Sequence, residues 1–126
     1  MNMRTPVKDA RGLGSAKDGV HHWWLQRVTA VALIPLVLWF AFSLAVHAGS
    51  GYEGMRAWVG SPFTAGAVIL LVATAFYHAQ LGLQVVLEDY VGNKALQVAG
   101  IVAVKFLAAV LALTGILAVL SIAFGG

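Results

Sequence analysis

One histidine, His78, lies inside a long apolar stretch, residues 63–87, that contains no charged side chain. An ionisable group at membrane depth is costly, so it needs either a hydrogen-bonding neighbour or a function. The position alone leaves two interpretations open. His78 is a neutral imidazole hydrogen-bonded to a neighbouring helix, or it is a ligand of a haem iron or a member of a proton relay.

Helical spacing adds further residues to the face that carries His78. If the stretch is a helix of about 3.6 residues per turn, His78, Gly82, Val85 and Asp89 share that face. Gly82 then leaves a recess one turn from the imidazole, which a porphyrin or the backbone of another helix can occupy. Asp89 lies about 16 Å farther along the axis, where the helix would leave the hydrocarbon.

Glu88, Asp89 and Tyr90 form an acidic and aromatic cluster at that point. Acids and tyrosine are ordinary markers of the boundary between membrane and water, and the residues alone favour this interpretation. The alternative is a quinone site, in which the phenol of Tyr90 donates a hydrogen bond to a quinone carbonyl. An adjacent carboxylate would orient that phenol or carry protons.

Polar residues also flank the first apolar stretch, residues 28–46. Arg27 is either a simple basic anchor or a guanidinium that pairs with haem propionates. His47, at the other end, is expected at the membrane interface, and Lys105 is expected to extend its amine toward the membrane surface. The remaining polar residues at membrane depth are expected to hydrogen-bond between helices. They are Thr29, Thr74, Gln80 and Gln84.

Composition indicates which elements must position these residues. Of 126 residues, 60% are hydrophobic and 10% are charged, which excludes both an ordinary soluble domain and a disordered chain. Each of three apolar stretches can cross about 30 Å of hydrocarbon as a helix. The fold class is therefore all-α and integral to the membrane, with helices at about 28–46, 63–87 and 95–124. Residues 1–27 form a polar N-terminal segment, and residues 28–126 form one three-helix domain.

Charge and cysteine content narrow the function further. The net charge is +3, and basic residues gather in the N-terminal segment, so this segment is expected on the cytoplasmic side and the C-terminus on the opposite side. The N-terminal segment does not fit a signal peptide, because its basic part and the following apolar stretch are too long. The chain has no cysteine, which excludes a thiol nucleophile and a cysteine-ligated iron–sulfur cluster within it.

Two segments give the chain a family resemblance. Residues 19–30 read Gly-Val-His-His-Trp-Trp-Leu-Gln-Arg-Val-Thr-Ala, and His78 to Tyr90 follow the pattern H-x3-G-x6-D-Y. Both are similar to the hydrophobic membrane anchor of bacterial succinate dehydrogenase, respiratory complex II. The resemblance covers residues 15–126 and implies that the chain is half of a haem-binding helix bundle.

The resemblance also implies roles for individual residues. It makes His78 an axial ligand of the haem b iron, with Gly82 packing against the haem. Asp89 and Tyr90 would border the ubiquinone site, with Tyr90 hydrogen-bonded to the quinone. Arg27 would lie near the haem propionates or the quinone, and His21 or its neighbour His22 would correspond to a single family histidine.

The resemblance implies partners as well. A second membrane anchor subunit of the cytochrome b type would supply the other iron ligand. A flavoprotein and an iron–sulfur subunit would dock on the cytoplasmic face of the bacterial inner membrane. The chain would then serve an enzyme of both the tricarboxylic acid cycle and electron transport, without being active alone. Two alternatives remain: an anchor of a quinol:fumarate reductase, and a structural or transport subunit without haem.

Overall fold

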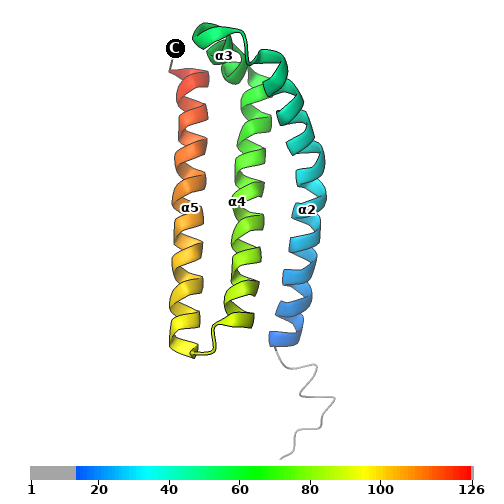
Figure 1. Cartoon of the computed structure of the whole chain (residues 1–126), viewed down its shortest axis with the longest axis vertical. Helices are drawn as coiled ribbons and strands as arrows, with labels where there is room; N and C mark the ends of the chain where they lie inside the picture. The colour runs from blue at the N-terminus through cyan, green and yellow to red at the C-terminus, as the bar shows by residue number, and fades with distance from the viewer. Residues whose placement is uncertain (1–13, 126) are drawn as a thin grey trace, which may run out of the picture.

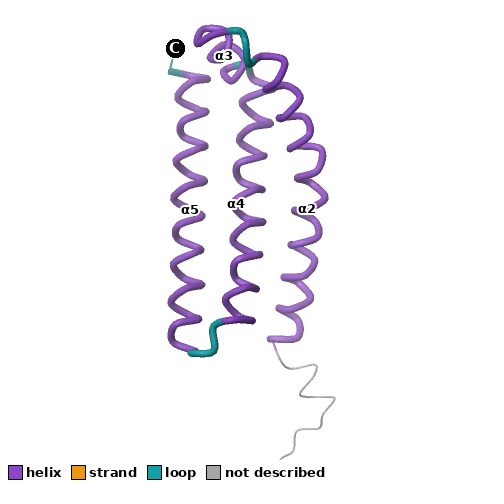
Figure 2. The backbone as a smooth tube through the Cα atoms, in the orientation of Figure 1, coloured by secondary structure: helices purple, strands orange, loops and turns teal. Residues whose placement is uncertain are grey.

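The computed structural model describes residues 14–125, and every regular element within that range is a helix (Figure 2). The elements are α2 (Gly14–His47), α3 (Gly51–Gly60), α4 (Pro62–Tyr90) and α5 (Lys94–Phe124). Figure 1 shows α2, α4 and α5 as three long rods, with α3 capping one end. We call the opposite end, where α2 and α5 begin and α4 ends, the N-terminal end.

Three of these helices are long and apolar enough to span a membrane: Gly19–His47, Pro62–Tyr90 and Lys94–Phe124. Few side chains are buried within the chain, and large apolar ones such as Leu38, Phe42 and Phe106 are exposed. Such a surface is stable against lipid or another apolar subunit. The predicted all-α, three-span membrane fold is confirmed.

Each spanning helix is longer than the apolar stretch from which it was predicted, and α2 differs most. It begins at Gly14, well before residue 28, because a helix does not have to stop where its apolar face ends. Pro35 lies inside α2 without ending it. The expectation for residues 1–13 of the polar N-terminal segment lies outside the described residues.

The helix ranges expected from the sequence leave residues 47–62 without a helix, and this was wrong for Gly51–Gly60, which forms α3. Gly51 has a φ of 76°, a conformation open to glycine, and the helix starts there. Met55, Trp58 and Val59 are partly buried and follow a helical i, i+3, i+4 spacing. In a segment of ten residues this spacing is too short to distinguish a helix from a loop by sequence alone.

The central helix is α4, which contacts both α2 and α5, whereas α2 and α5 share little contact with each other. Two glycines of α5 let it approach α4 closely. A Cβ at Gly100 would lie 3.3 Å from the Leu87 side chain, and one at Gly115 would lie 3.2 Å from Val72. On the other side, Trp39 of α2 packs edge-to-face against Phe63 of α4 with centroids 6.0 Å apart.

The turn from α4 to α5 is held by side chains. The carbonyl oxygen of the Asn93 side chain accepts from the backbone N–H groups of Ala95 and Leu96, which caps α5. Gln97 Nε2 donates to the Glu88 carbonyl, at 3.0 Å, near the end of α4. These contacts fix the register of the two helices near Asp89 and Tyr90.

Candidate functional site

The imidazole of His78 faces α2 and hydrogen-bonds one side chain there. Its Nδ1 lies 2.9 Å from the hydroxyl oxygen of Thr29, which is 49 residues earlier in the chain. The same hydroxyl lies 2.7 Å from the carbonyl oxygen of Leu25, one helical turn before it, and 3.1 Å from that of Gln26. The interhelical hydrogen bond expected for Thr29 is therefore present, and its partner is His78.

The direction of these hydrogen bonds follows from the number of protons. A hydroxyl has one proton, and a backbone carbonyl can only accept, so the shortest contact assigns the Thr29 proton to Leu25. The hydroxyl then accepts from Nδ1–H of His78. In a neutral imidazole this leaves Nε2 as the nitrogen with a lone pair. Among the side chains described, those of residues 19–125, and the backbone of residues 14–125, no group hydrogen-bonds that Nε2.

One turn along α4, Gly82 faces Gln26 of α2. A Cβ placed on Gly82 would lie 3.7 Å from Gln26 Nε2, an ordinary van der Waals distance. Packing inside this chain therefore does not require glycine at position 82. Gln26 Oε1 and His22 Nε2 are buried on α2 without hydrogen-bond partners, which is costly unless another group completes them.

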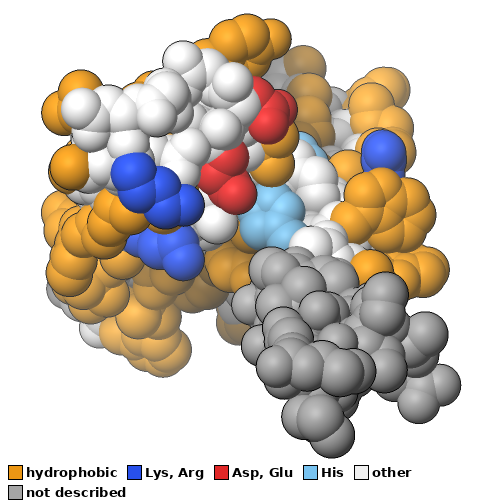
Figure 3. All heavy atoms as spheres, turned by 90° about the horizontal axis from the view of Figure 1, so that it is seen from below, with side chains coloured by type: hydrophobic (Ala, Val, Ile, Leu, Met, Phe, Trp, Pro, Cys, Tyr) orange, Lys and Arg blue, Asp and Glu red, His pale blue; other side chains and the backbone are white. Residues whose placement is uncertain are grey.

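A groove of about 1060 Å³ runs along α4 between α2 and α5, near the N-terminal end. Its polar lining comes from all three spanning helices, and the deeper part is apolar and small, with Ala108, Ala109 and Ala112. The polar members are His21, His22, Tyr77, Gln80, Gln84, Glu88, Asp89 and Lys105. Figure 3 views the molecule from this end, where acidic and imidazole side chains lie near one another at the mouth of the groove.

The groove lies to one side of the face of α4 that carries His78, and it reaches that face at Val85 and Asp89. Gln80 follows His78 by two residues, which places it about 200° around the helix axis. Gln80 lines the groove and is buried, whereas His78 and Gly82 do not line it. The imidazole therefore lies outside the groove, although Val85 and Asp89 of its own helix face line it.

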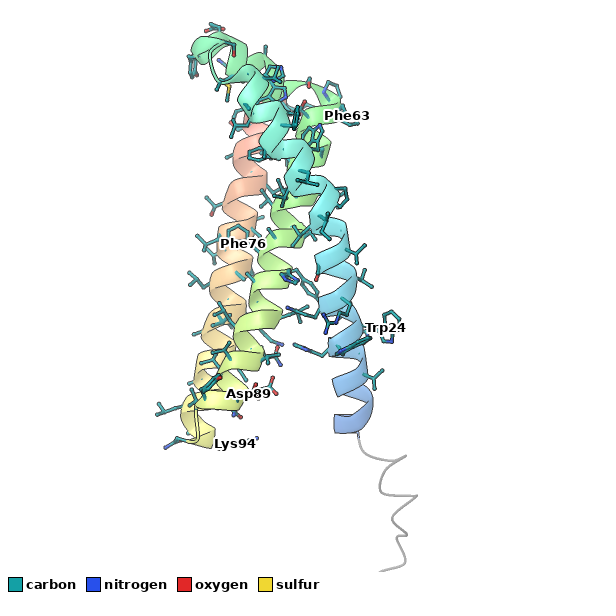
Figure 4. The ribbon with its side chains drawn as sticks, turned by 45° about the vertical axis from the view of Figure 1, so that its right-hand side comes forward. Trp24, Phe63, Phe76, Asp89 and Lys94 are labelled. Carbon is teal, nitrogen blue, oxygen red and sulfur yellow. The ribbon has the colours of Figure 1, made fainter. Side chains whose placement is uncertain are left out.

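The two residues expected at the quinone site diverge at the end of α4. Asp89 lines the groove and projects toward the space beside the start of α2 (Figure 4). Tyr90 is the last residue of α4, is 84% exposed and does not line the groove. Its Cα lies about 18 Å along the helix axis from that of His78, at 1.5 Å per residue. The phenol is thus available to a partner or ligand from outside the chain.

The structure does not bring Arg27 to His78. The Arg27 guanidinium lies over the ring of Trp23, with Cζ 5.2 Å from the centroid, and the side chain is exposed. Arg27 precedes Thr29 by two residues, so it points about 200° away from the Thr29 hydroxyl. A group bound by both Arg27 and His78 would have to extend around α2.

Other polar expectations have mixed outcomes. Gln80 Nε2 donates to Gln84 Oε1 at 3.0 Å, so these two amides pair along α4, and the expectation of an interhelical bond was wrong for this pair. Their i, i+4 spacing carries the signal that would have predicted it. Lys105 lines the groove near Gln80 and Gln84, consistent with a flexible stem that places its amine among polar groups.

The sequence did not identify Gln26, or the pairing of Thr29 with His78, as parts of the site. Both depend on the register between α2 and α4, which no local pattern encodes. Within the described residues, no group of three or more His, Asp and Glu side chains is placed to hold a metal ion. A metal bound through His78 would therefore take its other ligands from outside those residues.

Comparison with known proteins gives consistent results. Residues 1–121 match the family model described as succinate dehydrogenase/fumarate reductase transmembrane subunit. A protein of Rickettsia bellii named succinate dehydrogenase hydrophobic membrane anchor subunit is 36% identical over 104 residues, covering 82% of this chain and 83% of its own. A protein of the same name from Paracoccus denitrificans is 38% identical over 90 residues, covering 71% and 70%. No solved structure matches the chain.

Proposed function

The chain belongs to the family of succinate dehydrogenase/fumarate reductase transmembrane subunits, and on this basis we propose that it anchors a succinate:ubiquinone oxidoreductase, binds haem b through His78 and borders the site of ubiquinone reduction. It is a multi-pass membrane protein of that family. The family description names both succinate dehydrogenase and fumarate reductase. The relatives cited above are named for succinate dehydrogenase, which favours oxidation of succinate and reduction of quinone over the reverse reaction.

The observation that carries the haem proposal is the hydrogen bond between Thr29 and His78. A histidine that binds iron through one nitrogen usually donates its other N–H to an oxygen acceptor. Here Nδ1 has such an acceptor at 2.9 Å, and Nε2 is the nitrogen that remains for a ligand. The half-buried imidazole fits a flat group at the surface of the bundle, and Gly82, one turn away, has no side chain to obstruct such a group.

Haem b bound there would supply one-electron redox chemistry, held six-coordinate by two imidazoles. His78 provides one imidazole, and the second must come from the other membrane anchor subunit. The unpaired Gln26 Oε1 and His22 Nε2 on α2 are polar atoms that a bound group or partner could complete. His21 lies at the same end of α2, lining the groove, and Arg27 would reach a propionate only around the outer face of α2.

At the quinone, this chain contributes Tyr90 and Asp89. The Tyr90 hydroxyl donates a hydrogen bond to a quinone carbonyl oxygen, which polarises that carbonyl as electrons arrive. The carboxylate of Asp89, at the mouth of the polar groove, lies where protons enter from water. Reduction of the quinone takes two electrons and two protons, and the apolar product leaves through the lipid.

The electrons must come from other subunits, because this chain has no cysteine to hold an iron–sulfur cluster. We therefore propose that a flavoprotein and an iron–sulfur subunit bind at the N-terminal end. That end would face the cytoplasm of a bacterium, with the chain in the inner membrane and its C-terminus in the periplasm. The basic N-terminal residues and Lys94 support this orientation.

Purification of the tagged chain in mild detergent tests the proposal. We expect a flavoprotein, a cysteine-rich subunit and a second anchor to copurify, with the optical spectrum of a low-spin b-type haem and succinate-dependent ubiquinone reduction. A colourless chain that purifies alone would instead support a membrane subunit whose histidine serves only packing. If the partner subunits copurify without haem, the proposed anchor role stands, but the proposed role of His78 as a haem ligand does not.

A further inference from the structure

Thr29 is the one side chain in the described residues that hydrogen-bonds His78, and it is itself fixed. Its hydroxyl is held by the Leu25 carbonyl at 2.7 Å, on its own helix. This back-bond orients the lone pairs of the oxygen, and a β-branched side chain has few alternative rotamers within a helix. The acceptor offered to the imidazole is therefore preorganised before any ligand arrives.

We propose that Thr29 is a positioning residue for His78, and this inference rests on the proposed haem role. By accepting Nδ1–H, the hydroxyl holds the ring in the tautomer whose Nε2 lone pair is free, and it limits rotation of the ring about its bond to Cβ. The ligand nitrogen is thus selected by a residue of α2, although the ligand itself belongs to α4.

The contact also tunes the imidazole electronically. The Leu25 carbonyl, the Thr29 hydroxyl and the imidazole form a chain of hydrogen bonds in a partly buried region, and such chains polarise one another. A histidine whose Nδ1–H is accepted donates more electron density through Nε2. This donation stabilises the ferric state, so Thr29 lowers the midpoint potential of the haem.

The chain offers a matched pair of threonines for the test. Thr114 of α5 makes the same back-bond, from its hydroxyl to the Val110 carbonyl at 2.7 Å, but it is exposed and faces no histidine. Thr29→Val keeps the shape and removes the acceptor, whereas Thr29→Ser keeps the acceptor. Thr114→Val controls for loss of a threonine back-bond from a spanning helix.

In the purified complex we expect Thr29→Val to shift the haem midpoint potential upward, to change the ferric low-spin electron paramagnetic resonance signal and to reduce haem content. Thr29→Ser restores most of the wild-type potential, and Thr114→Val leaves it unchanged. A Thr29→Val complex with wild-type haem content, potential and resonance signal overturns the inference while the proposed function stands. A wild-type complex without haem overturns the proposed function instead.

A second measurement does not depend on haem or on how well a Thr29 variant folds. In wild-type complex prepared from haem-deficient cells and labelled with 15N-histidine, we expect the resonances of His78 to show a protonated Nδ1 and an unprotonated Nε2. The signal is assigned by its loss in His78→Ala. A proton on Nε2 with a bare Nδ1 would overturn the inference, because Thr29 would then be the donor.

Discussion

The imidazole of His47 stacks on the indole of Trp58, with ring centroids 4.8 Å apart and planes inclined by 11°. Its Nδ1 lies 2.8 Å from the Ser43 carbonyl, so this histidine is held by neighbours of its own chain. His78, in contrast, makes one hydrogen bond and keeps Nε2 free of partners within the described residues. His47 and His78 therefore have different surroundings: the first is completed by packing, and the second is open to a ligand.

We predict that His78→Ala abolishes the b-type spectrum of the purified complex or shifts it strongly, because it removes the proposed iron ligand. His47→Ala, at the opposite end of the bundle, is expected to leave the spectrum unchanged while lowering thermal stability through loss of the stack on Trp58. Optical spectra and haem extraction per mole of complex measure both. Equal haem content in wild type and His78→Ala would rule out His78 as a ligand.

Tyr90→Phe is predicted to lower ubiquinone reduction about ten-fold, the effect of losing one hydrogen bond worth roughly 1.4 kcal/mol. Succinate oxidation by an artificial dye should continue, since the dye takes electrons before the quinone site. Tyr52→Phe is the control, because Tyr52 is also exposed but belongs to α3 at the far end. Unchanged ubiquinone turnover in Tyr90→Phe would remove the phenol from the site.

Gly82→Ala separates packing within the chain from packing against a bound group. The new Cβ has room beside Gln26, and alanine favours a helix by up to about 1 kcal/mol, so the chain itself should tolerate the change. If haem lies against Gly82, the methyl group should reduce haem content or shift the spectrum. Gly66→Ala is the control on the same helix, since its Cβ would meet nothing within 4 Å. Identical haem content and spectra in both variants would argue against a haem contact at Gly82.

The orientation can be measured with single cysteines, because the chain has none of its own. Ser50→Cys and Gly92→Cys place a thiol at exposed positions at opposite ends of the bundle. We expect a membrane-impermeant maleimide to label position 50 in intact spheroplasts and position 92 only in inverted vesicles. The reverse pattern would place the N-terminal end outside the cytoplasm and contradict the proposed docking of the partner subunits.

The spanning helices could be predicted from the sequence because the hydrophobic requirement of a membrane is local and strong. α3 could not, because lipid does not impose a minimum length on it and its apolar residues repeat only once. The long N-terminal extension of α2 was missed for a related reason: hydropathy locates the hydrocarbon boundary, but hydrogen bonds within the backbone decide where a helix begins.

The site was only partly predictable. A buried histidine is visible in a sequence because its cost in lipid is large, so His78 could be singled out. Its pairing with Thr29 could not be, because it depends on how two antiparallel helices are aligned along their lengths. Asp89 and Tyr90 are neighbours in the sequence, but Asp89 lines the groove whereas Tyr90 is exposed outside it. This difference depends on how the last turn of α4 is oriented in the bundle, which the sequence does not show.

The early start of α2 has a mechanical consequence. From Gly14 onward the helix is continuous, so its polar first turns and the turn that holds Thr29 move together as one rigid segment. Within the chain, α2 packs mainly against α4 and has little contact with α5, so α5 does little to restrain a tilt of α2. A partner that displaces the polar first turns would therefore also displace Thr29 relative to the His78 imidazole. Conversely, a movement of the imidazole would shift those first turns.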